Sequence, residues 1–114
     1  MYSRVKNALN TLNLPLYLCT KSEDKVSDYI VLNYTSTPIL YSDNEIKFTR
    51  YQILLNLVLT KNIESTKQEV LKLMREHGFK GGRCQTMQPE YKGSVVVGYN
   101  TAITFTIDVE EDMQ

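Results

Sequence analysis

The sequence has little of what most metal centres and catalytic sites are built from. Its 114 residues include one histidine and two cysteines, Cys19 and Cys84, which lie far apart along the chain. A zinc site needs closely spaced pairs of such ligands, so this pattern predicts no metal site. The single histidine, His77, would also have to serve any serine or cysteine nucleophile as its base. We therefore expect no catalytic residues, no metal and no cofactor, and a protein that is not an enzyme.

An excess of charge of either sign is also missing, because 13 Lys and Arg balance 13 Asp and Glu. A neutral chain has no overall field to draw it to nucleic acid or to an anionic membrane. The longest apolar stretch, Ile53 to Leu59, is interrupted by Asn56 and is far shorter than the roughly 20 residues of a membrane span. The N-terminus has no apolar stretch of signal-peptide length, so we expect a soluble intracellular product with reduced thiols.

Local motifs that resemble ligand sites have ordinary structural interpretations. Residues 43–45, Asp-Asn-Glu, suit a hairpin turn better than a lone cation site, because Asn and Asp bond to nearby backbone there. Residues 78–83, GFKGGR, resemble a phosphate loop but follow a helix, where the dipole is negative. The eight tyrosines would suit a platform for single-stranded nucleic acid, yet several fall where strands favour aromatic residues.

Apolar residues at three- and four-residue spacing predict two helices. The first is short and ends before Pro15, because proline breaks the hydrogen-bond ladder. The second begins at a capping box, either Ser65 with Gln68 or Thr66 with Glu69. We expect it to end at Gly78 in a left-handed cap, with Phe79 closing the hydrophobic contact. The apolar stripes are Val5, Ala8, Leu9 and Leu12 in the first helix, and Val70, Leu73, Met74 and His77 in the second.

Alternating apolar residues predict five strands. They span residues 16–20, 29–35, about fifteen residues ending near 60, 83–87 as a weak or edge strand, and 101–109. The segment around Pro38 is expected to be a connection, and the segment 81–98 a polar insertion. The long strand has one unbroken apolar face. Its other face mixes polar and apolar positions, as expected for a surface that is partly solvated or partly covered by something else.

The order of elements is α-β-β-β-α-β-β, without a repeat or a low-complexity segment. Hairpin-like strands together with one clearly signalled helix predict an α+β fold. In this fold a mostly antiparallel sheet packs against two helices on one face. The length predicts a single domain, 1–114. Residues 110–114 are expected to form a flexible acidic tail.

The ordered set of segments resembles the tail-completion, or tail-terminator, proteins of long-tailed bacteriophages and prophages of Gram-positive bacteria. The segments are DYIVLNY, LYSDNEIKFTRYQILLNLVLTK, STKQEVLKLMREHGF and YNTAITFTIDV. In that family a PYIVY-like strand is followed by a YADN turn, a long strand with a YQVELY core, a helix ending in Gly and a final strand. The resemblance covers residues 5–109, with 41–44 matching the turn and 51–55 the strand core.

The resemblance implies a structural role without catalysis. Such a subunit forms a homo-oligomeric ring, usually of six copies, that caps the tail tube at its head-proximal end and joins it to the head. Its partners would be other copies of itself, the major tail tube protein and the head-completion or connector protein, and DNA would only pass through the lumen. The implied location is the virion tail, and the host cytoplasm during assembly.

Two surfaces are candidates for these contacts. We expect the mixed face of the long strand to meet a neighbouring subunit, because a closed ring uses heterologous contacts between different patches. We expect the segment 81–98 to be a mobile loop that points into the lumen or at a tail partner. The residues involved are Gln52, Leu54, Asn56 and Val58 for the first surface, and Lys80, Arg83 and Lys92 for the second.

Two other classes of function remain open on the residues alone. One is a small monomeric binding or inhibitor module acting on a phage or host protein. The other is an enzyme that uses carboxylates such as Asp43 and Glu45. The mass of the purified protein discriminates between them and the ring, because only the ring requires self-association.

Overall fold

The protein is described by a computed structural model that covers residues 1–19, 28–40 and 47–111. The predicted turn at 43–45 and residues 112–114 of the predicted tail lie outside these ranges, whereas residues 110 and 111 form the end of the last strand. In chain order the elements are α1 (Tyr2–Leu9), a 3-10 helix (Asn10–Leu12), β1 (Leu16–Leu18), β2 (Tyr29–Leu40), β3 (Lys47–Leu59), α2 (Ile63–Glu76), β4 (Lys80–Cys84), β5 (Gln88–Lys92) and β6 (Val95–Glu111).

The strands of the described residues form one six-stranded sheet with the order β1-β2-β3-β6-β4, in which β5 pairs with the first part of β6. Only β1 and β2 run parallel, and every other pair is antiparallel. The predicted α+β class with a mostly antiparallel sheet is therefore confirmed. The order of elements differs by one strand, because three strands follow α2 where two were expected.

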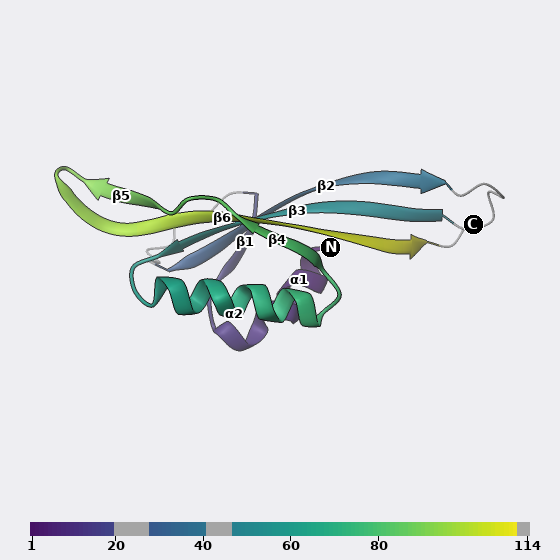
Figure 1. Cartoon of the computed structure of the whole chain (residues 1–114), viewed down its shortest axis with the longest axis horizontal. Coiled ribbons are helices and arrows are strands. Elements are labelled where there is room, and N and C mark those ends of the chain that lie inside the picture. Colours follow the sequence, from purple (N-terminus) through teal and green to yellow (C-terminus); the bar gives the residue numbers. More distant parts are fainter. Residues whose placement is uncertain (20–27, 41–46, 112–114) are drawn as a thin grey trace.

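Both helices cover the same face of the sheet, as predicted (Figure 1). Period-two alternation sends one set of side chains from β2, β3 and β6 toward the helices, where Leu55 is fully buried between its neighbours Leu32 and Ile103. The same core contains α1 and α2 side chains. The fully buried members with large side chains are Phe79, Phe105, Ile30, Leu32, Ile53, Leu55, Leu57, Leu59, Met74, Ile103, Val5 and Val70.

Helix α2 ends as predicted and begins earlier than predicted. The N–H of Phe79 donates to the Met74 carbonyl at 3.0 Å and that of Gly78 to the Arg75 carbonyl at 3.1 Å, with Gly78 at φ 89°. This is the Schellman pattern, and Phe79 is buried. The prediction of a capping box at Ser65 or Thr66 is wrong, because the helix starts earlier, at Ile63, after Asn62, whose φ is 53°.

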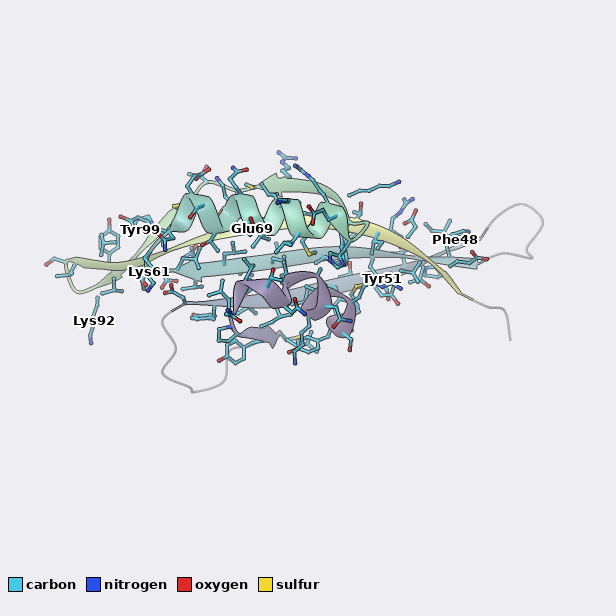
Figure 2. The ribbon with its side chains drawn as sticks, turned by 90° about the horizontal axis from the view of Figure 1, so that it is seen from below. Phe48, Tyr51, Lys61, Glu69, Lys92 and Tyr99 are labelled. Atoms are coloured by element: carbon cyan, nitrogen blue, oxygen red, sulfur yellow. The ribbon has the colours of Figure 1, made fainter. Side chains whose placement is uncertain are left out.

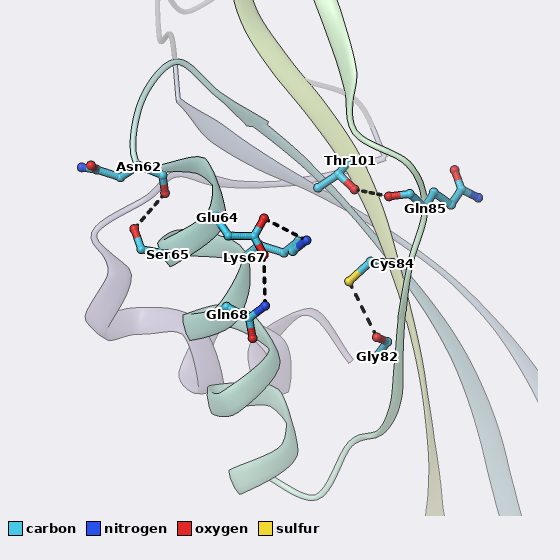
Figure 3. A network of polar contacts seen from close by, with 9 residues as sticks. All are labelled: Asn62, Glu64, Ser65, Lys67, Gln68, Gly82, Cys84, Gln85 and Thr101. Atoms are coloured by element: carbon cyan, nitrogen blue, oxygen red, sulfur yellow. Dashed lines mark hydrogen bonds and ion pairs between the residues drawn. The ribbon is translucent and has the colours of Figure 1, made fainter.

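In the predicted capping box the Ser65 hydroxyl accepts from a backbone N–H, but in the structure this hydroxyl has another partner. Ser65 Oγ donates to the Asn62 carbonyl at 3.1 Å (Figure 3). The first turn is stabilised instead by Glu64, which accepts from Gln68 at 3.2 Å and forms an ion pair with Lys67 at 3.1 Å. His77 is the residue after the last helical turn and is exposed, so it does not continue the buried stripe.

The sheet is much longer than the helices that cover it. The molecule measures 59 × 26 × 24 Å. At one end β2, β3 and β6 extend past both helices as a three-stranded arm, and at the other the β5–β6 hairpin projects alone (Figure 1). The arm includes residues 36–40, which the sequence predicted to be a connection, since β2 continues through Pro38 to Leu40.

Candidate interaction surface

The face of the sheet opposite the helices carries no element of the described chain, and we call it the open face. Gln52, Leu54, Asn56 and Val58 all lie on it, because they alternate with the buried residues of β3. The prediction that they share one face is thus confirmed, and their role in a subunit contact stays a prediction. Leu54, Asn56 and Val58 are half-buried and Gln52 is exposed.

Two rows of side chains cross four strands of the open face. In the first row Asn33, Leu54, Thr104 and Arg83 are register partners on β2, β3, β6 and β4. In the second row Thr35, Gln52, Thr106 and Lys80 are partners in the same strand order. Between these rows runs a shallow groove of about 690 Å³, lined by both rows and by the residues between them.

Most of the groove surface is formed by carbon atoms, although most of the residues that line it are of polar types. Leu54, the threonine methyl groups and the aliphatic stems of long cationic side chains all contribute carbon atoms to such a surface. Lys80 and Arg83 are exposed, and neither has an ion pair with another described residue. The groove therefore combines an apolar floor with two unpaired cations at one end.

The structure brings together residues that the sequence assigned to two separate surfaces. Gln52 and Leu54 of β3 line the same groove as Lys80 and Arg83 of β4, because β4 pairs with β6 and not with its neighbours in sequence. Lys92 does not join them. It lies at the hairpin end of the molecule, opposite the end that contains Phe48 (Figure 2).

The segment 81–98, expected to be a mobile loop, is mostly strand. β4 is an edge strand of the sheet and β5 forms a hairpin with β6. Strand β4, the first part of this segment, is held to α2, since Arg75 Nη2 donates to the Gly81 carbonyl at 3.1 Å. Thr101 Oγ1 also donates to the Gln85 carbonyl at 2.9 Å (Figure 3), which fixes the chain between β4 and β5.

The projecting hairpin exposes apolar side chains, a feature that sequence reasoning missed. Tyr91 is 62% exposed and Val95 61% exposed, and Val96 and Val97 are exposed as well. Tyr91 and Val96 are register partners on one face, and Val95 pairs with Lys92 at the tip. The signal was present as three consecutive valines in a segment otherwise rich in glycine and polar residues.

Two carboxylates of the sheet accept hydrogen bonds from side chains of neighbouring strands. Arg50 Nε donates to Asp108 Oδ1 at 2.8 Å, and Arg50 Nη2 to Oδ2 at 3.1 Å. These hydrogen bonds hold the pKa of Asp108 below its usual range. Toward the hairpin, Asn100 Nδ2 donates to Glu90 Oε1 at 3.1 Å. Burial raises the pKa of Tyr29, and the nearby negative charge of Glu90 raises it further.

Chemically reactive side chains are scattered over the described part of the chain. Within residues 1–19, 28–40 and 47–111, no three His, Cys, Asp or Glu side chains gather where they could hold a metal ion. Cys19 is exposed, and the half-buried Cys84 donates its Sγ hydrogen to the Gly82 carbonyl at 3.7 Å. Neither described helix is long and apolar enough to span a membrane.

No family model and no curated protein matches this chain.

Proposed function

We propose that this chain is a tail-terminator protein of a long-tailed phage or prophage. Six copies form a ring that binds the last ring of the tail tube, stops further addition of the tube protein, and presents a surface to the head connector. The mechanism is binding and geometry without catalysis. The subunit acts in the host cytoplasm during assembly and stays at the head-proximal end of the tail, where DNA passes through the lumen.

The observation that carries the proposal is the open face. The long strands β2 and β3 leave Val31, Leu54 and Val58 half-buried, with no helix or loop of the described chain above them. A sheet that must stand alone in water usually has a polar outer face, whereas this one carries an apolar-lined groove. Exposed apolar surface of this kind favours a protein partner, and a second copy is always available as one.

The shape and charge of the molecule support a ring. A long sheet with helices on one side can place its arm against one neighbour and its hairpin end against another, which gives the two different patches that a heterologous contact needs. The neutral net charge allows copies to approach one another without strong repulsion. Lys80, Arg83 and Lys92 then remain candidates for contact with the tail partner or the lumen.

The first experiment measures mass in solution, by light scattering after size exclusion and by native mass spectrometry. A hexamer, visible as a ring in negative-stain electron micrographs, is the expected result, formed alone or after mixing with tube protein. Leu54→Glu combined with Val58→Glu is expected to give a folded monomer. Lys61→Gln with Lys72→Gln changes the net charge equally at exposed positions away from the open face, and is expected to keep the ring.

A second experiment tests the capping role. Purified protein is added to growing tail tubes, and tubes of fixed length that no longer accept tube protein are expected. Deletion of residues 89–93 is expected to abolish joining of tail to head. A protein that stays monomeric at high concentration and in the presence of tube protein would contradict the proposal, and would favour a monomeric binding module.

A further inference from the structure

We infer that two copies of this chain pair edge to edge, through β4 and the end of β6, as a two-fold symmetric dimer. The contact lies at the edge of the sheet and not in the open-face groove. The inference goes beyond the proposed ring and does not depend on it, because it concerns the free subunit before it meets a tail. A second copy fits this edge because one stretch of it is basic and the next is acidic.

The end of β6 is an edge with unused backbone groups. β4 pairs with β6 only as far as Thr106, and β6 continues past it into the arm (Figure 1). No strand of the described residues pairs with 107–111 on the side away from β3. The Gln85 N–H donates to the Ala102 carbonyl at 2.8 Å, so even-numbered residues of β6 direct their backbone groups toward this side. The two even-numbered residues of 107–111 therefore offer N–H and carbonyl groups to an added strand.

The two stretches of this edge carry opposite charges on the same face of the sheet. Lys80 and Arg83 of β4 lie on the open face. Asp108 and Glu110 lie on it as well, because they alternate with the buried residues of β6. Arg83 and Glu110 are exposed, and neither has an ion pair with another described residue. Asp108 is bound by Arg50, yet its side chain remains 36% exposed.

Symmetry and the pleat determine the register of the contact. β4 stands out from the end of β6 by one strand width, about 4.8 Å, and leaves a recess beside it. A two-fold axis perpendicular to the sheet places β4 of each copy in the recess of the other, parallel to β6 there. The closest approach that keeps both pleats in phase, without overlap of the two β4 strands, sets Lys80 of one copy beside Asp108 of the other. The same register sets Arg83 beside Glu110, and symmetry forms each pair twice.

Other pairings of the free edges are disfavoured. Two β6 ends placed side by side would set Asp108 and Glu110 against the same carboxylates of the other copy. The free part of the β2 edge contains Pro38, which has no N–H to donate. The acidic residues of β6 thus act against pairing with themselves and favour β4 of a second copy.

The contact is expected to be weak. The Gly81 carbonyl of β4 already accepts from Arg75 at 3.1 Å, so backbone bonding adds little on that strand. Exposed ion pairs each contribute modestly to association. We expect a dissociation constant on the order of 0.1 mM, so that the free chain is dimeric near about 1 mM and monomeric at micromolar concentrations.

The test exchanges the charges of one pair, Arg83 and Glu110, and measures mass by sedimentation equilibrium. Arg83→Glu alone sets like charges together twice, and so does Glu110→Arg alone. Each variant is expected to dimerise at least about 30-fold more weakly than the wild type. Mixed in equal amounts, the two variants are expected to form a mixed dimer of wild-type strength, because every pair is then of opposite sign.

The matched control for net charge is Lys61→Glu, at an exposed site at the hairpin end of the molecule (Figure 2). Its mixture with Glu110→Arg has the same two net charges as the test mixture, but retains one pair of like charges, Arg83 beside the new arginine. This mixture is expected to dimerise more weakly than the test mixture.

A second measurement covers the case in which a charge variant fails to fold. A background with Cys19→Ser and Cys84→Ser removes the native thiols. In it, Arg83→Cys with Glu110→Cys is expected to give a disulfide-linked dimer upon oxidation. Within one chain the two positions are about 20 Å apart along β6, too far for a disulfide. Lys61→Cys in place of Glu110→Cys is the control, and is expected to give no cross-link.

The outcomes separate this inference from the proposed function. A free wild-type chain that stays monomeric at about 1 mM overturns the edge dimer and leaves a ring on the tail tube unaffected. Self-association that is equally strong in both charge variants, or a test mixture no more dimeric than either variant alone, also overturns it. A chain that dimerises as described but never forms a ring with tube protein overturns the proposed function alone. A mixed dimer with the specific cross-link establishes the edge contact.

Discussion

Arg50 on β3 and Asp108 on β6 face each other across the arm in a two-pronged ion pair, with donor–acceptor distances of 2.8 and 3.1 Å. The hydrogen bonds from Arg50 lower the pKa of Asp108. A carboxyl whose pKa is lower in the folded state stabilises that state above the pKa it has when unfolded, about 3.9. This stabilisation is lost as the pH falls through the lower, folded value.

Asp108→Asn is therefore expected to lower the urea midpoint modestly at pH 7, and to lower it less at acid pH, because the wild-type carboxyl becomes protonated as the pH falls through the lowered pKa of Asp108. Urea titrations at the two pH values measure the difference. Glu110→Gln serves as the control, because it removes one acid from the same strand and leaves the ion pair intact. An equal loss for Asp108→Asn at both pH values would assign the effect to side-chain packing.

Gly82 of β4 lies against side chains of α2. Its φ is 101°, and a Cβ added there would lie 2.8 Å from Leu71 Cδ2 and 3.0 Å from Arg75 Nη2. Gly82→Ala is expected to cost about 2 kcal/mol or more of unfolding free energy, from backbone strain and overpacking. The control is Gly93→Ala, with φ 66° and nothing within 4 Å, for which about 1 kcal/mol is expected. Equal losses in chemical denaturation would exclude the packing component.

Phe79 joins the end of α2 to the core, since it closes the helix cap and is 2% exposed. Phe79→Ala is expected to lower the unfolding free energy by about 3–5 kcal/mol, because it leaves a cavity under the helix. Glu76→Ala, at an exposed site in the last turn, is expected to change it by less than about 0.5 kcal/mol. A loss below about 1 kcal/mol for Phe79→Ala would contradict the central place of this residue.

Local patterns in the sequence predicted the features that depend on neighbouring residues. The alternation of Ile103, Phe105 and Ile107 predicted which face of β6 is buried, and all three are in the core. Gly78 and Phe79 predicted the end of α2, because a left-handed residue followed by an apolar one is a signal of short range. The face of β3 that carries Leu54 followed from the same period-two rule.

Features set by tertiary pairing were not predictable in this way. The groove exists because β4 lies beside β6, so that Arg83 and Leu54 come to share one row, and no local pattern encodes that neighbour. The start of α2 was misplaced because Ser65 donates to the Asn62 carbonyl, a choice between two local hydrogen bonds of similar strength. The hairpin was missed because its exposed valines lack the alternation of a half-buried strand.

Pro38 lies within β2 without breaking the sheet, and the hydrogen-bond direction explains why. The Ile30 N–H and the Leu32 carbonyl bond to residues on the β1 side, so even-numbered residues of β2 direct their backbone groups away from β3. Pro38 is even-numbered and its missing N–H would face the outer edge, where β1 no longer pairs. A proline at such a position also hinders pairing with strands of other molecules.

Prolines placed on either side of this alternation are expected to behave differently. Ser36→Pro also faces the outer edge and is expected to leave the fold intact, whereas Thr37→Pro removes a hydrogen bond to β3 and is expected to lower the thermal midpoint markedly. Pro38→Thr is expected to keep the fold and to increase concentration-dependent association, because it restores an N–H at an unpaired edge. Circular dichroism melting and light scattering measure both effects, and equal melting of the Ser36→Pro and Thr37→Pro variants would contradict the assigned bond direction.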